Sequence, residues 1–169
     1  IGASSVSGNF DLVAGGAGGA DAPATRFDSG GNLVQITAAT DGECFDPDVD
    51  ATGERIVFAS TQHNRNSDIY IKAARGRTMT QITSDTADDL MPAFGPDGDR
   101  IAFASNRSGN WDIYVTNVHG DPAMQLTFSD DNELHPTWSP DGTRIAYCRL
   151  GTMSGQWEIW VIDLDQPST

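Results

Sequence analysis

The stretch that decides the fold is MPAFGPDGDRIAFASNRSGNWDIYV, residues 91–115. Its segment GPDG at 95–98 is a turn sequence, because proline presets φ, aspartate can bond its own backbone and glycine accepts a positive φ. The apolar run RIAF at 100–103 is typical of a β-strand, and so is DIYV at 112–115, which is rich in β-branched and aromatic residues. The stretch therefore predicts short strands joined by tight turns.

Two further copies of this pattern lie on either side of it. FDPDVDATGERIVFAS begins at Phe45, and HPTWSPDGTRIAYCR begins at His135. Pro47, Pro92 and Pro136 occupy matching places and lie 45 and 44 residues apart. A period of about 44 residues with several short strands in each unit is typical of a β-propeller, in which four antiparallel strands form one blade. We therefore expect an all-β fold with about three four-stranded blades and one incomplete blade.

The repeat also divides the chain into blades. Three blades are expected at 41–83, 84–127 and 128–169, the last of them without its outer strand. Residues 1–40 contain NFDLV at 9–13 and VQIT at 34–37, which are similar to the third and fourth strands of a blade. A Gly-rich stretch lies between them, so residues 1–40 are expected to form a partial blade with a long loop.

These motifs resemble the repeat of the TolB-like β-propeller family, whose unit centres on WSPDGxRIAF and, further on, SxRxGxxDIYV. The resemblance covers about residues 41–163 and is close in the second and third copies. The first copy departs at the turn, where DATG stands at 50–53, and its loop at 63–66 lacks the usual glycine. The resemblance implies a propeller fold, but the repeat occurs in periplasmic scaffold proteins, in gating domains of peptidases and in some lyases. Function therefore has to be argued from sites.

The charge balance limits the partners. Asp and Glu number 24 against 10 Lys and Arg, and the net charge of −14 argues against a nucleic-acid partner. No apolar run reaches the roughly 18–20 residues that a membrane span needs. The chain starts at Ile1 without a methionine, as a mature protein that has lost a signal peptide would, and as a fragment would. We expect an extracellular or periplasmic protein whose partner is itself or another protein.

Three aspartates are the strongest candidate for a binding site. Asp46, Asp48 and Asp50 alternate along an expected strand, so their side chains should share one face. The other two copies have no acidic residue at these places, so the acids are additions to the repeat. Clustered carboxylates favour a hard cation such as Ca²⁺, whereas the simpler interpretation is a solvated acidic strand. No other cofactor is expected.

Two cysteines, Cys44 and Cys148, leave two interpretations open. Either they form a disulfide in an oxidising compartment, or they are two small buried side chains. Cys44 precedes the first strand of blade 1, and Cys148 ends the second strand of blade 3. Because neighbouring strands are antiparallel, both cysteines should lie on the same face of the propeller.

Catalytic residues are not expected. His63, His119 and His135 fall in different parts of their repeats and give no metal-ligand spacing. Nearly every Ser and Asp is explained by its place in the repeat, so no Ser/His/Asp arrangement emerges. We therefore expect a protein that is not an enzyme.

The ends of the array leave strands without neighbours. The expected N-terminal strand contains Val34 and Ile36, and the last strand contains Trp157, Ile159 and Trp160. Unpaired strands invite strand addition, so these five residues are expected to form an assembly edge. Exchange of the N-terminal strand between chains would give a closed oligomer or a filament. We therefore expect a protein-interaction or self-assembly module with a structural role. The alternative is a ligand- or Ca²⁺-binding propeller domain of a larger enzyme, such as a peptidase or a lyase.

Overall fold

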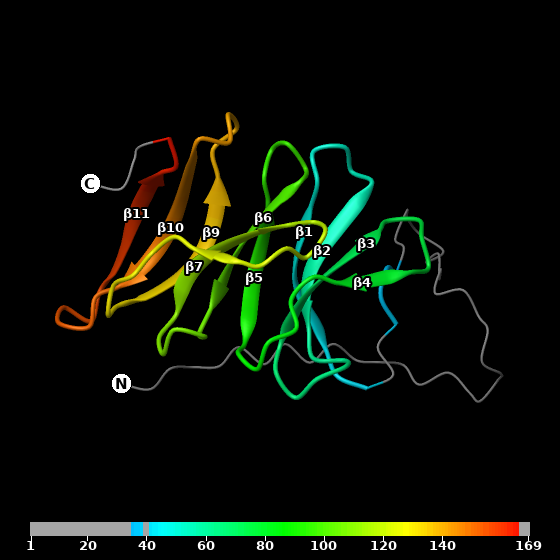
Figure 1. The fold of residues 1–169 in the computed structure, drawn as a ribbon, viewed down its shortest axis with the longest axis horizontal. Coiled ribbons are helices and arrows are strands. Elements are labelled where there is room, and N and C mark those ends of the chain that lie inside the picture. Colours follow the sequence, from blue (N-terminus) through cyan, green and yellow to red (C-terminus); the bar gives the residue numbers. More distant parts are fainter. Residues whose placement is uncertain (1–34, 39–40, 166–169) are drawn as a thin grey trace, which may run out of the picture.

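The chain folds into short β-strands joined by turns, with no helix in the described residues. The computed structural model describes residues 35–38 and 41–165. Within them, eleven strands form three antiparallel sheets, which stand side by side in chain order (Figure 1). The expectation of an all-β fold built from propeller blades is confirmed.

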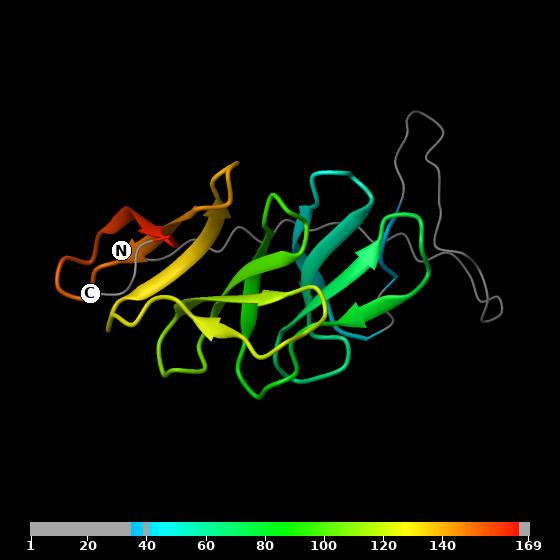
Figure 2. The same cartoon turned by 45° about the horizontal axis from the view of Figure 1, so that its top comes forward.

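The first two sheets have four strands each, and the third has three. Blade 1 consists of β1 (Cys44–Val49), β2 (Arg55–Ser60), β3 (Asp68–Ala73) and β4 (Met79–Gln81). Blade 2 consists of β5 (Asp89–Phe94), β6 (Arg100–Ser105), β7 (Asp112–Asn117) and β8 (Met124–Gln125). Blade 3 consists of β9 (Asn132–Trp138), β10 (Arg144–Leu150) and β11 (Trp157–Asp163). Within each sheet, every strand pairs with the next one in the chain, and the three sheets follow one another along the long axis of the molecule (Figure 2).

The predicted N-terminal partial blade lies almost wholly outside the described residues, and so does Val34. Residues 35–38 are described and belong to no strand, with Ile36 half-buried. The match of VQIT to the repeat therefore does not make a strand of residues 35–37 within the single chain. The physical reason is that a strand needs a ladder partner, and none of the eleven described strands pairs with this segment.

The turn inside each blade explains the register of its first two strands. In blade 2, Asp97 Oδ1 accepts hydrogen bonds from the backbone N–H groups of Asp99 at 2.9 Å and Arg100 at 3.1 Å. Gly98 has a φ of 69°, which a residue with a side chain rarely adopts. The turn sequence thus fixes where β5 ends and β6 begins.

The core lies between the blades. Side chains that are buried between blades 1 and 2 include Val57, Ile69, Phe94, Ile101 and Phe103. Those between blades 2 and 3 include Ala102, Ala104, Ile113, Ile145 and Tyr147. Alternate residues of β6 thus point to opposite neighbours, which explains the apolar run from Ile101 to Ala104. Full burial of one such large side chain stabilises the fold by about 1.5–3 kcal/mol, so packing between blades holds the array together.

Candidate interaction site

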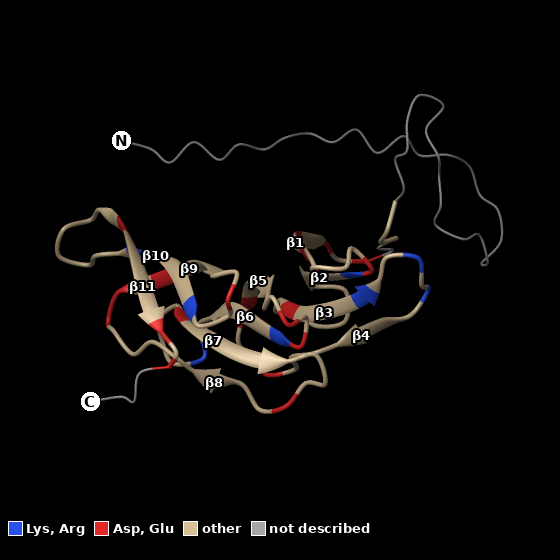
Figure 3. Cartoon of the chain, turned by 90° about the horizontal axis from the view of Figure 1, so that it is seen from above, with Lys and Arg blue, Asp and Glu red and all other residues tan. Residues whose placement is uncertain are grey.

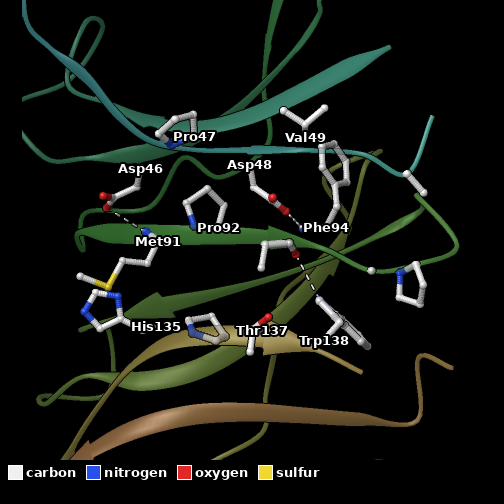
Figure 4. A pocket seen from close by; sticks show the side chains of 15 residues that line it. Asp46, Pro47, Asp48, Val49, Met91, Pro92, Phe94, His135, Thr137 and Trp138 are labelled. Atoms are coloured by element: carbon white, nitrogen blue, oxygen red, sulfur yellow. Dashed lines mark hydrogen bonds between the residues drawn. The ribbon is translucent and has the colours of Figure 1, made fainter. Parts of the chain in front are cut away.

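The inner strands of the three blades, β1, β5 and β9, border an open groove of about 500 Å³ (Figure 4). Each inner strand contains one residue in the left-handed region: Asp46 with a φ of 51°, Met91 with 54° and His135 with 57°. The pairing with the second strand shifts register at each of these places, as in a β-bulge. A proline follows each of them, so its nitrogen cannot donate to the ladder. The bulge occurs in all three blades and therefore belongs to the geometry of the repeat.

Asp46 and Asp48 tie the inner strand of blade 1 to that of blade 2. The backbone N–H of Met91 donates to Asp46 Oδ2 at 3.3 Å, and that of Phe94 donates to Asp48 Oδ2 at 2.7 Å (Figure 4). Inner strands of neighbouring blades do not share a ladder, so these side chains satisfy backbone donors that would otherwise lack a partner. Both carboxylates thus have a structural role at the groove.

Asp50 does not join the other two acids. It lies beyond the end of β1, is buried, and does not line the groove. Its carboxylate accepts hydrogen bonds from the backbone N–H groups of Glu54 and Arg55 and from Arg55 Nε at 2.9 Å. Burial alone would raise the pKa of Asp50, but the hydrogen bonds from Arg55, together with those from Thr52 and Glu54, lower it to about 2. Asp50 therefore performs in blade 1 the turn-forming role of Asp97, and it is not an addition to the repeat.

The predicted Ca²⁺ site is thus reduced to two carboxylates. In the described part of the chain, no group of three or more His, Cys, Asp or Glu side chains is placed to hold a metal ion. Asp46 and Asp48 line the groove, and each already accepts a backbone N–H. Binding of Ca²⁺ at these two residues stays a prediction.

In each of the first two blades, the arginine that follows the turn forms a hydrogen bond to the next blade. Arg55 Nη2 donates to the carbonyl oxygen of Gly98 at 2.6 Å, and Arg100 Nη2 donates to that of Gly142 at 3.2 Å. Their guanidinium carbons also lie 5.4 and 4.5 Å from the centroids of aromatic rings in the next blade. Arg144 holds the same place in blade 3, where its side chain is 55% exposed and forms an ion pair only within its own turn among the described residues. The end of the array therefore presents a donor group without a neighbouring blade.

The outer face of blade 3 is the largest departure from the pattern of the other blades. Strand β11 pairs with β10 alone among the described strands. Ile159 is 73% exposed, whereas its equivalents Ile69 and Ile113 are fully buried. Trp157, Trp160 and Val161 are also exposed. Of the predicted assembly edge, Trp157, Ile159 and Trp160 thus lie together on a free strand, which we call the free edge.

The two cysteines lie at the same end of their blades. Cys44 pairs with Ser60 at the end of β2, and Cys148 lies one residue before Arg149, the equivalent of Ser60 in β10. Both thiols are free, and blade 2 stands between them. A disulfide between them stays a prediction, and within one chain it would require blades 1 and 3 to meet.

Arg107, in the loop between β6 and β7, and Arg149, near the end of β10, are paired with acids at or just before the first strand of their own blade. Arg107 binds Asp85 at 2.6 Å and Asp89 at 2.9 Å, and Arg149 binds Asp131 at 2.5 Å. Figure 3 shows acidic residues on all three blades, which agrees with the net charge of −14. Acidic residues that are exposed to solvent, such as Asp99, Asp121 and Asp130, favour a basic partner and oppose an acidic one.

The three histidines occupy separate places. His63 packs beside the ring of Tyr70 at 5.8 Å, and His119 lies 3.8 Å from Asp99. His135 lines the groove. They are therefore not assembled into one site.

These features first define a class of protein: consecutive blades of a β-propeller, packed face to face. The chain belongs to the TolB β-propeller family, because the family model described as "TolB beta propeller domain" matches residues 29–169. No helix in the described residues is long and apolar enough to span a bilayer.

Solved structures agree with this assignment. TolB from Acinetobacter baumannii is 24% identical with a TM-score of 0.60, and the match covers 71% of this chain and 30% of that one. A TolB described as putative, from Agrobacterium tumefaciens, is also 24% identical, with a TM-score of 0.64 and coverage of 74% and 44%. A puromycin-hydrolysing peptidase from Mycobacterium tuberculosis is 16% identical, with a TM-score of 0.56 and coverage of 79% and 23%. At these identities the likeness shows the fold alone, and the chain spans less than half the length of each structure.

Proposed function

We propose that this chain is a non-catalytic, periplasmic TolB-like module that associates with a second copy of itself through the free edge of blade 3. The observation that carries the proposal is the exposure of Ile159, at a place where both other blades have a fully buried isoleucine. An apolar surface of this kind is typical of an interface.

The chemistry of the free edge favours an added strand. In blades 1 and 2 a fourth strand pairs with the third, as β4 does with β3 and β8 with β7. In blade 3 the outer side of β11 offers its backbone donors and acceptors without a described partner, next to exposed Trp157 and Trp160. The N-terminal segment of a second copy, with Val34 and Ile36, would supply the missing strand by exchange between chains. A reciprocal exchange gives a closed pair, and a non-reciprocal one gives a filament.

The absence of a catalytic role is supported by the site. The groove is bordered by side chains that bond to backbone groups, and the three histidines lie apart within the described residues. The periplasmic location is supported by membership of the TolB family. Fractionation of cells that express the complete protein would test the location.

The decisive measurement is analytical ultracentrifugation over a range of protein concentrations. We expect the wild-type chain to associate, Ile159→Lys to sediment as a monomer, and the matched control Phe128→Lys to associate like the wild type. Phe128 is 76% exposed and lies outside every strand, so the control changes charge and exposed apolar area in the same way. Deletion of residues 1–37 should also abolish association. A wild-type monomer, or an assembly that both Ile159→Lys and the deletion leave intact, would contradict the proposal.

A second candidate is a ligand-binding propeller domain of a larger enzyme. The similarity to the M. tuberculosis peptidase, of which this fold covers 23%, favours it. In that case the free edge would be covered by further blades of the same protein. The chain alone would then stay monomeric, and it would alter hydrolysis of a peptide only when joined to a catalytic domain.

A further inference from the structure

Two buried carboxyl groups meet at the junction of blades 2 and 3. Asp112 begins β7 and Glu133 lies in β9, and the exposed fraction of each is 1%. Asp112 Oδ2 accepts hydrogen bonds from Ser108 Oγ and from Gln125 Nε2, the latter at 3.1 Å. Glu133 Oε1 accepts one from Ser129 Oγ at 2.9 Å. One oxygen of each carboxyl group therefore has a hydrogen-bond partner.

The other oxygen of each group has no partner. Asp112 Oδ1 and Glu133 Oε2 are both fully buried and unpaired among the described residues. The backbone N–H of Glu133 donates to the carbonyl oxygen of Trp111 at 2.7 Å, so Glu133 and Asp112 are neighbours across the junction. Two ionised carboxylates in contact, away from water, repel each other and lose their hydration. One proton removes both problems, because a protonated carboxyl donates to the ionised one and both open oxygens then gain a partner.

Among the described residues, no Lys or Arg side chain donates a hydrogen bond to either carboxyl group of the pair. From β10, Arg149 and Tyr147 are the ionisable groups that face Glu133. Arg149 directs Nε to Asp131 Oδ2 at 2.7 Å and Nη2 to the same oxygen at 2.5 Å, so its hydrogen bonds go to Asp131. The other side chains that touch the pair, from β8 and the loops around it, are neutral: Ser108, Gln125, Thr127 and Ser129.

The junction of blades 1 and 2 differs in this respect. There the matching pair is Asp68 and Asp89, both fully buried. Arg107 Nη2 donates to both oxygens of Asp89 at 2.9 Å and so compensates its charge. The same repeat positions thus carry an arginine-bound carboxylate at one junction and an uncompensated pair at the other.

We propose that Asp112 and Glu133 share one proton in the folded chain and that loss of this proton, as the pH rises, weakens the contact between blades 2 and 3. On opening, the O–H···O bond between the two groups breaks, the proton passes to water, and both carboxylates become hydrated. The position of blade 3, which carries the free edge, would therefore depend on pH.

The sign of the pH dependence follows from the burial. Burial raises the pKa of Asp112 and of Glu133 above the ordinary carboxyl values. A raised pKa in the folded state means that the folded protein binds the proton more tightly than the unfolded one. The stabilising effect is then complete below the ordinary carboxyl pKa and is lost as the pH rises through the folded-state pKa. For one shared proton, the unfolding constant rises by up to about tenfold per pH unit within that window.

The test compares Glu133→Gln and Asp112→Asn with the matched control Asp130→Asn. Asp130 is exposed in the loop that precedes β9. In each pair variant an amide N–H can replace the shared proton at every pH. We expect the urea concentration at the midpoint of unfolding to decrease as the pH rises from the ordinary carboxyl pKa through the raised one, in the wild type and in the control. The midpoint should change much less with pH in the pair variants. Infrared difference spectra of the wild type should also contain the carbonyl band of a protonated carboxyl at pH values where exposed carboxyls are already ionised, and Glu133→Gln should lack it.

Each contrary result overturns the proposal. The infrared carbonyl band can be measured on the wild type even if one variant fails to fold. Absence of the band from the wild type, or an unchanged pH dependence in the pair variants, would show that no proton is shared. Stabilisation of the wild type by added Ca²⁺, absent in Glu133→Gln, would show that the pair holds a cation instead.

Discussion

Blades 2 and 3 have the same repeat but different surroundings. Ile113 in β7 is fully buried, whereas Ile159 at the matching place in β11 is 73% exposed. The neighbouring aromatic residue lies on the opposite side of the sheet, in the core between blades 1 and 2 for Tyr114, which is 4% exposed, whereas Trp160 is 42% exposed. Burial in this array is therefore decided by the strands and blades around a strand and not by its own sequence. Blade 3, the last of the described array, therefore exposes apolar side chains of the kind that are buried in blades 1 and 2.

The largest expected effect comes from truncating the two isoleucines. Ile113→Ala should destabilise the chain by about 2–5 kcal/mol, because it leaves a cavity between blades 2 and 3. Ile159→Ala should change the stability of the monomer by less than about 0.5 kcal/mol, because the side chain is exposed. Urea unfolding at low protein concentration measures both. Equal losses in the two variants would mean that β11 is covered in the monomer.

The fold could be predicted because the repeat is periodic and its turns are explicit. Three copies of a Pro-containing pattern at a constant spacing specify three sheets, and GPDG at 95–98 specifies where a strand turns. The exposure of Trp157, Ile159 and Trp160 agrees with a third copy for which no fourth strand is described. The segment at 34–37 had no such support. Four residues similar to a strand do not determine which strand they pair with, and residues 35–37 pair with none that is described.

A second comparison concerns the turns of blades 1 and 2. Asp50→Asn should cost about 1–3 kcal/mol at neutral pH, because it weakens the bonds to Arg55 in a buried turn. Asp97→Asn should cost at most about 1 kcal/mol, because the Asp97 side chain is 41% exposed. The pKa of Asp50 is lowered to about 2, so its contribution is present above the ordinary carboxyl pKa and is lost as the pH falls through about 2. The difference between Asp50→Asn and wild type should therefore shrink in acid. Urea unfolding at neutral and acidic pH checks this, and a difference that grows in acid would refute the assignment.

The candidate sites were harder to predict than the fold. Asp50 was grouped with Asp46 and Asp48 by alternation, but alternation holds only within a strand, and β1 ends at Val49. In blade 1 the carboxylate of the turn stands two places earlier than in blade 2, which a comparison by position cannot detect. The pair Asp112 and Glu133 was missed for another reason. The two residues are 21 apart, lie in different blades, and meet only once the blades pack.

The smallest expected effect concerns the arginines that follow the turns. Arg100 donates to the carbonyl of Gly142 and lies 4.5 Å from the centroid of the Trp138 ring, whereas Arg144 has no blade beyond it in the described array. Arg100→Gln should therefore cost about 1 kcal/mol, the sum of a partly exposed cation–π contact and one hydrogen bond to a neighbouring blade. Arg144→Gln should cost less than about 0.5 kcal/mol in the monomer. Both variants lose one positive charge, so each controls for the net charge of the other. If the chain associates through blade 3, the cost of Arg144→Gln should rise with protein concentration toward that of Arg100→Gln, because the guanidinium then meets a neighbour. A cost for Arg144→Gln that stays constant at all concentrations would mean that Arg144 lies outside the interface.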